Sequence, residues 1–254
     1  MYLFNARLNK FVWQNYWYLM IVAGCLSVTF VLTGNILFGV AFIFICYATL
    51  LVYGAAHYNK SVFADFAKLH NFTYIGKDVK ELAINLEGLI FRIGTNQRLD
   101  NIVVGKGEVI ATLAYDIKIS ENHYQTFFWT VLCIDLPAPT PHIYLDSRHD
   151  FFTAQPELLA NCERVDLEGD FPDHFNMYMA KGSSTESLTI LSPDVMALLV
   201  DYSREYSIEL LNSRAVYILD GILSDPNELE GLHQQAQKLV KKISPELKRM
   251  SRIP

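Results

Sequence analysis

The chain begins with two long apolar runs that contain no charged residue. The first covers residues 16–33 and the second residues 36–56. An α-helix rises about 1.5 Å per residue, so roughly 20 apolar residues cross the hydrocarbon core of a bilayer. Only Gly34-Asn35 separates the runs, and both residues tolerate the positive φ of a tight reversal. The pattern predicts a membrane-anchoring helical hairpin, with helices at about residues 16–33 and 36–56.

The charges that flank the hairpin predict its orientation. Arg7 and Lys10 precede the first apolar run, Lys60 and Lys68 follow the second, and the connection carries no charge. Because Lys and Arg accumulate on the cytoplasmic side of membrane proteins, both ends of the hairpin are expected in the cytoplasm. The remainder of the chain, including its C-terminus, is then cytoplasmic as well.

A second interpretation of the first run is a lipoprotein signal, since Val22-Ala23-Gly24-Cys25 matches a lipobox. A signal peptide needs a charged region, a short apolar region and then the cleavage site. Here the polar residues Gln14 and Asn15 precede the motif, and the apolar run continues beyond it to Leu32. The sequence therefore favours a cysteine in the middle of a transmembrane helix over a lipidated one.

Beyond residue 59 the pattern changes to short, alternating apolar segments. In residues 109–119, Leu113, Tyr115, Ile117 and Ile119 alternate with small or polar residues, which is typical of a half-buried antiparallel strand. Residues 61–70 instead repeat apolar positions at helical spacing and predict a stalk that continues the second helix. Further strands are expected at residues 72–75, 88–94, 102–104, 124–136, 142–145 and 164–167.

The last third of the chain mixes strand and helix signals. The prolines of "LPAPTPH" predict an interruption after residue 136, and Ser192-Pro193-Asp194 predicts the start of a helix. Residues 207–211 and 215–219 predict a hairpin around Asn212-Ser213. Together the segments indicate an α+β class, in which the transmembrane α-hairpin precedes a mainly antiparallel β-sheet and C-terminal helices.

Charge divides the chain into an apolar head, an acidic body and a basic tail. Residues 60–232 contain 26 acidic and 13 basic side chains, whereas residues 233–254 contain 6 basic side chains and one acidic side chain. The predicted organisation is a hairpin at 1–59, an acidic domain at 60–224 and a basic tail at 225–254. An acidic body is a poor match for nucleic acid. The four cysteines lack zinc-site spacing, so no cofactor is expected.

His142, Asp146 and His149 form the densest cluster of residue types that bind metals or catalyse reactions. The alternative is a turn at the end of a strand, shaped by Asp146-Ser147-Arg148. A second acidic run, "LEGDFPDHF" at 167–175, could likewise hold a cation. Its Gly and Pro residues favour turns, with Phe171 and Phe175 in the core.

The C-terminal segment predicts an amphipathic helix with a basic face. Its apolar stripe comprises Leu229, Leu232, Ala236, Leu239, Val240 and Ile243. Its basic residues are Lys238, Lys241, Lys242, Lys248, Arg249 and Arg252. Such a helix can lie on anionic lipid or bind a partner. The alternative is an ordinary end that packs on the acidic body, and Pro245 is expected to end or bend the helix.

Four segments after the two-helix anchor resemble a family of bacterial membrane proteins of the kind found in Saccharibacteria and other candidate phyla. They are "PHIYLDSR" (141–148), "LEGDFPDHFNMY" (167–178), "LSPDVMALLVD" (191–201) and "IELLNSRAVYIL" (208–219). The resemblance implies a bacterial inner-membrane location and a cytoplasmic domain. It implies no reaction, ligand or catalytic residue.

The leading hypothesis is a non-enzymatic inner-membrane anchor that presents a cytoplasmic binding domain to a protein or lipid partner. It rests on the apolar hairpin and on the lack of a motif with catalytic spacing. The alternative is a membrane-bound hydrolase or metal-dependent enzyme that uses His142, Asp146 and His149.

Overall fold

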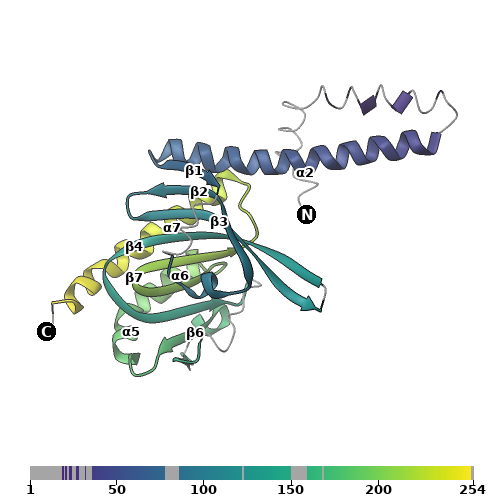
Figure 1. Cartoon of the computed structure of the whole chain (residues 1–254). Helices are drawn as coiled ribbons and strands as arrows, with labels where there is room; N and C mark the ends of the chain where they lie inside the picture. The colour runs from purple at the N-terminus through teal and green to yellow at the C-terminus, as the bar shows by residue number, and fades with distance from the viewer. Residues whose placement is uncertain are drawn as a thin grey trace. The chain divides into compact units, whose positions relative to one another are not determined.

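The computed structural model describes residues 19, 21, 23–24, 27–28, 32, 36–77, 86–121, 123–149, 159–167 and 169–252 (Figure 1). The chain divides into two compact units, Met1–Val62 and Phe63–Pro254. Of the first expected transmembrane helix, the described residues are helical. Gly34-Asn35 lies outside the described residues, so the hairpin itself stays a prediction.

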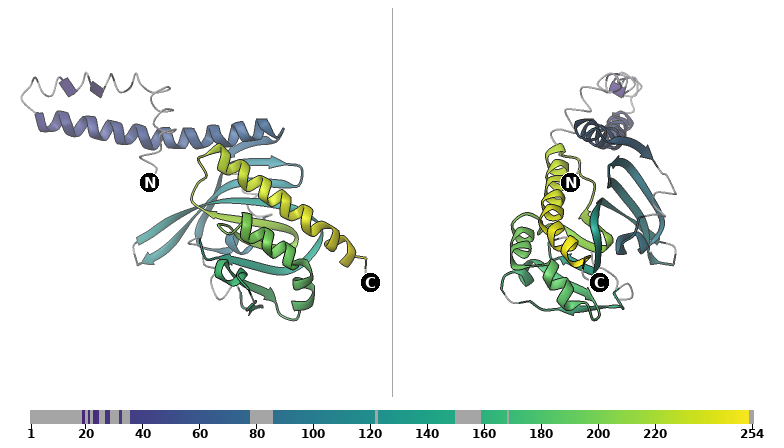
Figure 2. Two further views of the ribbon diagram at one scale, coloured as in Figure 1. Left: turned by 180° about the vertical axis from the view of Figure 1, so that it is seen from behind. Right: turned by 90° about the vertical axis from the view of Figure 1, so that its left-hand side faces the viewer.

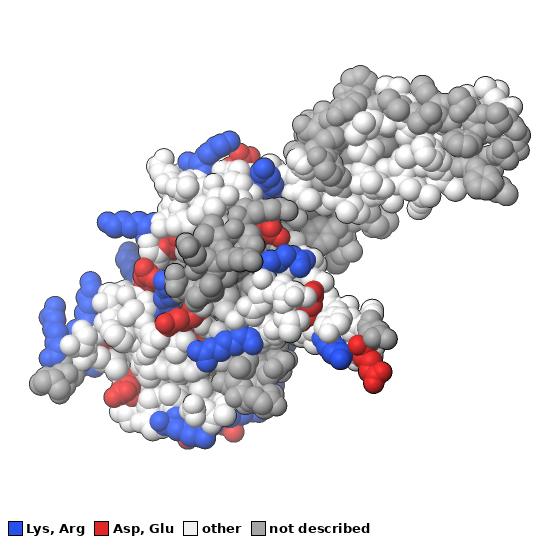
Figure 3. Space-filling view, in the orientation of Figure 1, with Lys and Arg blue, Asp and Glu red and all other residues white. Residues whose placement is uncertain are grey.

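Helix α2 (Ile36–Leu69) joins the second expected transmembrane segment and the expected stalk into one helix of 34 residues. Within the described chain, the part of α2 at Val40–Leu69 is long and apolar enough to cross a membrane. Phe44 is 75% exposed and Val52 is 71% exposed, so these side chains have no protein core around them. The described residues of the first unit show no Lys, Arg, Asp or Glu atoms before Lys60 (Figure 3). One apolar helix is therefore present where the sequence predicts the second span.

The second unit is built on a sheet whose strands all pair antiparallel, as the alternating pattern predicts. Its described strands are β1 (Thr73–Lys77), β2 (Thr95–Gly105), β3 (Glu108–Ser120), β4 (His123–Ser147), β5 (Cys162–Val165), β6 (Phe175–Ala180) and β7 (Ser207–Asp220). They are arranged in the order β1-β2-β3-β4-β6-β5, and β7 pairs with β4. Strand β4 is the centre, because its first half pairs with β3, its last residues pair with β6, and β7 pairs with both parts.

Helices cover one side of this sheet. They are α4 (Phe171–His174), α5 (Ser184–Ile190), α6 (Pro193–Tyr202) and α7 (Pro226–Met250), and α5, α6 and α7 lie on the same side in Figure 2. Helix α6 begins where Ser192-Pro193-Asp194 predicts it. Helix α7 contacts β4 and runs through Pro245 to Met250, so Pro245 does not end the helix; the alternative expectation, a bend at Pro245, stays a prediction.

The other side of the sheet is covered by residues 86–93. Leu89 and Ile90 pack there against Leu113, Trp129 and Val131. These sheet residues alternate with others that face the opposite side, where α7 contacts β4. The buried residues of α7 are Leu229, Leu232, His233, Ala236, Leu239, Ile243 and Leu247. The sheet thus has two apolar faces, each with its own cover.

Residues 88–94 do not form the expected strand. They form a short 3-10 helix, η2 (Leu89–Arg92), between Gly88 at φ 148° and Gly94 at φ 69°. A β-carbon on Gly94 would lie 2.7 Å from the Asp116 backbone oxygen, so glycine is required at this close approach. The apolar residues of this segment are buried because the segment packs on one face of the sheet; it does not form a strand of the sheet.

Residues 207–219 form the single strand β7 and not the predicted hairpin. Asn212 adopts φ 53°, and the register between β4 and β7 shifts on either side of its partner Thr140. Asparagine tolerates this left-handed conformation, so the same residue that suggested a turn makes a bulge here.

The prolines at 137, 139 and 141 do not interrupt β4, contrary to the sequence expectation. Pairing with β3 ends at Ile134 and pairing with β6 begins at Ile143. The prolines, which have no N–H to donate, therefore occupy the stretch of β4 between its two ladders.

Candidate functional site

The candidate site lies where residues 86–93 contact the irregular parts of β4 and β7. Oε2 of Glu209 accepts a hydrogen bond of 2.6 Å from the backbone N–H of Leu89, and the Glu209 side chain is fully buried. The Asn212 side-chain amide donates to the Glu87 carboxylate. Two side chains of β7 thus hold the segment that caps the sheet.

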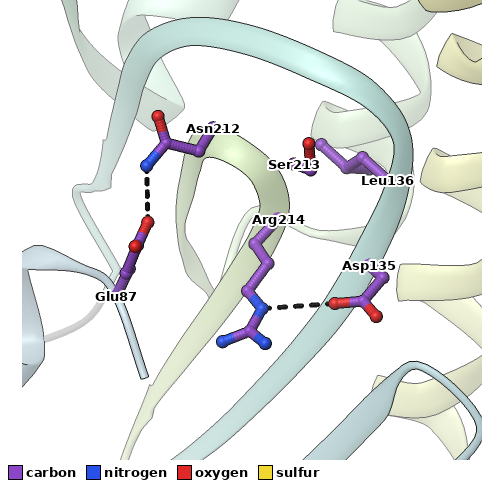
Figure 4. Close-up of a pocket in the computed structure, with 6 residues that line it drawn as sticks. All are labelled: Glu87, Asp135, Leu136, Asn212, Ser213 and Arg214. Carbon is purple, nitrogen blue, oxygen red and sulfur yellow. Dashed lines mark hydrogen bonds and ion pairs between the residues drawn. The ribbon is translucent and has the colours of Figure 1, made fainter. Parts of the chain in front are cut away.

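A polar pocket of about 410 Å³ opens beside these contacts (Figure 4). Its lining residues are Glu87, Asp135, Leu136, Asn212, Ser213 and Arg214. Nε of Arg214 donates to Oδ1 of Asp135 over 3.2 Å, and that pair faces the Asn212–Glu87 pair across the pocket in Figure 4. A polar ligand would have to break these two side-chain pairs in order to form its own hydrogen bonds, so its net gain in binding free energy would be small.

His142 extends the site from β4. Its Nε2 lies 2.6 Å from Oε1 of Glu209, and its Nδ1 lies 3.5 Å from Sγ of Cys162 on β5. A thiol, an imidazole and a carboxylate therefore stand in a row, the order used by enzymes with a cysteine nucleophile.

The electrostatics of the row oppose such chemistry. Burial raises the pKa of the Cys162 thiol, the negative charge of Glu209 raises it further, and Lys181 lowers it by less. A nucleophilic cysteine needs a lowered pKa, because the thiolate is the reactive form. The row is better described as a buried carboxylate that is hydrogen-bonded to His142 and to the Leu89 N–H.

Asp146 and His149 form hydrogen bonds with residues that do not contact His142. The Asp146 carboxylate accepts from the Tyr144 hydroxyl at 3.1 Å and from the Asn176 amide at 3.0 Å, and burial raises its pKa. Nε2 of His149 lies 3.0 Å from Nδ1 of His174. The three predicted metal ligands are thus not brought together into one donor set among the described residues.

The second acidic run, at 167–175, also has structural contacts. Asp170 precedes the first turn of α4, and Phe171 and Phe175 are buried with ring centroids 5.0 Å apart. Glu168 lies outside the described residues. The two phenylalanines occupy the core as the sequence predicts.

The basic residues of α7 lie away from its buried stripe. Nζ of Lys238 is 4.5 Å from the centroid of the Tyr202 ring, and Lys242 pairs with Asp194 at 3.2 Å. Arg249 pairs with Glu246, one turn away on the same helix. Lys241 and Lys248 are exposed on α7, and Arg252, which follows the end of the helix, is exposed as well. Because the apolar stripe packs in the domain, only the basic face is available to lipid or to a partner.

Two residues of the site escape sequence reasoning. Glu209 is an acid inside the strongly apolar run "SIELL", and an acid at such a position signals a buried partner. Cys162 is the first residue of the short strand β5 and carries no such signal.

Neither protein-family models nor curated proteins give a match to this sequence. Among solved structures, the crystal structure of the mycobacterial trehalose monomycolate transport factor A, TtfA, is similar, with a TM-score of 0.50 and 13% sequence identity. The similarity covers 76% of this chain and 93% of that chain. At this identity the comparison shows a similar fold.

Proposed function

We propose that this chain is a non-enzymatic membrane anchor whose α+β domain binds a lipid partner at the cytoplasmic face of a bacterial inner membrane. The observation that carries the proposal is helix α2. Its segment Val40–Leu69 is apolar enough to cross a membrane and exposes Val40, Phe44, Ile45 and Val52. The last turns of the same helix, from Phe63, belong to the second unit.

Exposed apolar side chains on a long helix are stable in lipid. Each Phe, Ile or Val at the centre of a transmembrane helix favours insertion by about 0.3–0.6 kcal/mol, whereas an Asp opposes it by about 2.5–3.5 kcal/mol. The absence of charge between residues 36 and 56 therefore supports insertion. The two-helix hairpin and the cytoplasmic termini belong to this proposal and rest on the sequence pattern.

A lipid partner is supported by the fold comparison. TtfA is by name a transport factor for trehalose monomycolate. For this chain, the exposed basic residues Lys241, Lys248 and Arg252 supply positive charge that anionic head groups attract. The purification experiment described below can also identify a protein partner.

Membrane insertion is tested with a matched pair of isoleucines. Ile45 on α2 is 63% exposed and Ile119 on β3 is 55% exposed. We expect Ile45→Asp combined with Val52→Asp to move part of the protein into the soluble fraction on carbonate extraction, because only the first apolar run is then left to insert, and Ile119→Asp to leave it in the membrane. Release of the unaltered protein by carbonate would overturn the anchor. Digestion of the domain by a protease added outside spheroplasts would overturn its cytoplasmic placement.

The partner is tested by purification in mild detergent, followed by mass spectrometry of bound lipid and protein. We expect a lipid class enriched over the bulk membrane, and we expect the enrichment to fall when Lys241, Lys248 and Arg252 are all changed to Gln. A stoichiometric protein without enriched lipid identifies a protein partner and contradicts the lipid proposal. Bulk lipid composition with no bound protein contradicts both.

The Cys162–His142–Glu209 row has the residue types of one alternative function, a membrane-bound hydrolase with a thiol nucleophile, although the raised pKa of Cys162 opposes it. It differs from the sequence hypothesis, because Asp146 and His149 are not part of it. Rapid and specific labelling of Cys162 by an electrophilic ester or amide probe at neutral pH would support that alternative.

A further inference from the structure

Two histidines and two glutamates meet within the second unit, away from the site described above. His70 follows the last residue of α2, Glu230 and His233 lie on α7, and Glu108 is the first residue of β3. Nε2 of His70 lies 2.6 Å from Oε2 of Glu230, and Nε2 of His233 lies 2.8 Å from Oε2 of Glu108. The two imidazole rings have centroids 4.6 Å apart.

The cluster contains a donor set suited to a metal ion. One potential ligand atom each from His70, Glu230 and His233 lies within 4.8 Å of the other two. Imidazole nitrogen and carboxylate oxygen are ligands that zinc and similar divalent ions accept. Among the described residues, this group of three is the one that satisfies that distance.

His233 supplies an independent observation. The residue is 7% exposed, and its Nδ1 is buried without a hydrogen-bond partner among the described residues. If Nε2 carries the proton and donates to Glu108, Nδ1 presents a lone pair. Two ordinary His–Glu ion pairs would account for both Nε2 atoms and leave this buried nitrogen unexplained.

The local sequence places the ligands on one helix face. Glu230 and His233 are separated by three positions, so their side chains are neighbours on α7. Phe66 and Phe72 flank the histidines, with centroids 4.4 Å from the His70 ring and 5.8 Å from the His233 ring, respectively. The rings cover part of the cluster, while the side chains of His70 and Glu230 stay 22% and 27% exposed and leave a path for an ion to enter.

The carboxylates are themselves oriented. Nε2 of Gln234 donates to Oε1 of Glu230 at 2.7 Å, and the Gln237 amide donates to Oε1 of Glu108. A metal-binding histidine usually donates its second N–H to a carboxylate, which fixes the ring and makes the free nitrogen a better ligand. Glu108 has that relation to His233.

We propose that His70, Glu230 and His233 bind a divalent transition-metal ion, with zinc the best match, and that Glu108 orients His233 from outside the ligand set. Zinc ligands at about 2.0–2.1 Å from the ion lie about 3.3 Å apart. Binding therefore opens the 2.6 Å His70–Glu230 contact by less than about 1 Å and draws together ligand atoms that now lie up to 4.8 Å apart. Three protein ligands leave one position for water. The ion joins residues 160 positions apart, at the end of α2 and the start of α7.

The test uses the full chain in mild detergent, purified without an oligohistidine tag and stripped with a chelator. We expect uptake of one equivalent of Zn²⁺ by elemental analysis, visible d–d absorption bands with Co²⁺, and a higher melting temperature with either ion. His70→Asn, Glu230→Gln and His233→Asn should abolish the uptake. Glu108→Gln should weaken it about 10- to 100-fold. His123→Asn, an exposed histidine at the start of β4, is the matched control and should bind like the unaltered protein.

Two results would overturn the proposal. One is stoichiometric uptake that survives when all three ligands are replaced, and the other is no uptake by the folded, unaltered protein. If His233→Asn fails to fold, the partly exposed His70→Asn decides, with circular dichroism as the check on folding. The outcome is independent of the membrane function proposed above, because carbonate extraction and lipid enrichment do not use these residues.

Discussion

His142 on β4 and Glu209 on β7 are hydrogen-bonded, with Nε2 and Oε1 2.6 Å apart, and the Glu209 side chain is fully buried while that of His142 is 19% exposed. A buried carboxylate is costly unless its charge and its lone pairs are compensated. His142 and the Leu89 N–H provide that compensation. The relationship makes His142 part of the scaffold that holds residues 86–93 on the sheet.

We therefore expect His142→Ala to destabilise the domain by about 1–3 kcal/mol, because it leaves Oε1 of the buried Glu209 without its hydrogen-bond partner. Changing Glu209→Gln in the same chain should recover part of the loss, since the buried charge is then removed. Urea unfolding in detergent measures both effects, with His123→Ala as a surface control expected within about 0.5 kcal/mol of the unaltered protein. Equal stability of the His142→Ala and His123→Ala variants would show that the pair has no such role.

Cys162 should react slowly with iodoacetamide at neutral pH, because burial and Glu209 raise its thiol pKa. Glu209→Gln removes the nearby negative charge, so it should lower that pKa and speed alkylation at neutral pH several-fold. Peptide mass spectrometry over a range of pH distinguishes Cys162 from the other three cysteines. Fast labelling with no dependence on pH would contradict this electrostatic account and favour the thiol enzyme.

Gly94→Ala should destabilise the domain more than Gly182→Ala. Both glycines have positive φ, at 69° and 80° respectively, so both substitutions carry backbone strain of about 1 kcal/mol or more. Only at Gly94 would the new β-carbon also meet the Asp116 backbone oxygen and the Tyr115 ring, each at 2.7 Å; at Gly182 nothing lies within 4 Å. The difference between the two melting temperatures isolates the steric term. A larger loss for Gly182→Ala would refute the close approach.

Alkaline stability should depend on Tyr206. Burial raises its pKa from 10.0 to about 12, and Glu205 and Glu228 add to the shift. The folded state therefore holds the phenol proton more tightly than the unfolded state. The resulting stability is complete below pH 10 and is lost as the pH rises to about 12.

Tyr206→Phe should reduce the fall in melting temperature across that pH window. The fall should not vanish, because the pKa of Tyr115 is also raised to about 12 by burial. Tyr124→Phe, at a side chain that is 53% exposed, is the control. An unchanged pH dependence in the Tyr206→Phe variant would count against the shift.

Local patterns in the sequence were sufficient to predict much of the fold. Alternation in residues 109–119 gives β3, the Ser192-Pro193 cap gives α6, and the apolar run at 36–56 gives most of α2. Each of these signals depends on neighbours in sequence. The expectations that failed involve tertiary context: residues 88–94 cap the sheet and do not join it, and Asn212 forms a bulge opposite the irregular part of β4.

The candidate sites could be predicted only in part, for the same reason. His142 was predicted as a site residue from its residue type. Its partners, Cys162 on β5 and Glu209 on β7, are too far away in the sequence to be recognised from spacing. His70 and Glu230 are 160 positions apart. The one local sign of that cluster is the Glu-x-x-His spacing on α7, which is weak until the fold places His70 beside it.

The three prolines of β4 also bear on association between molecules. Alternate residues of a strand direct their backbone groups to the same edge, so Pro137, Pro139 and Pro141 all remove a donor from one edge of this strand. A strand from another copy that approached there would find carbonyl groups but no N–H groups across about three successive sites. The longest strand of the domain is thereby protected, along its unpaired stretch, from the edge-to-edge growth that leads to aggregates.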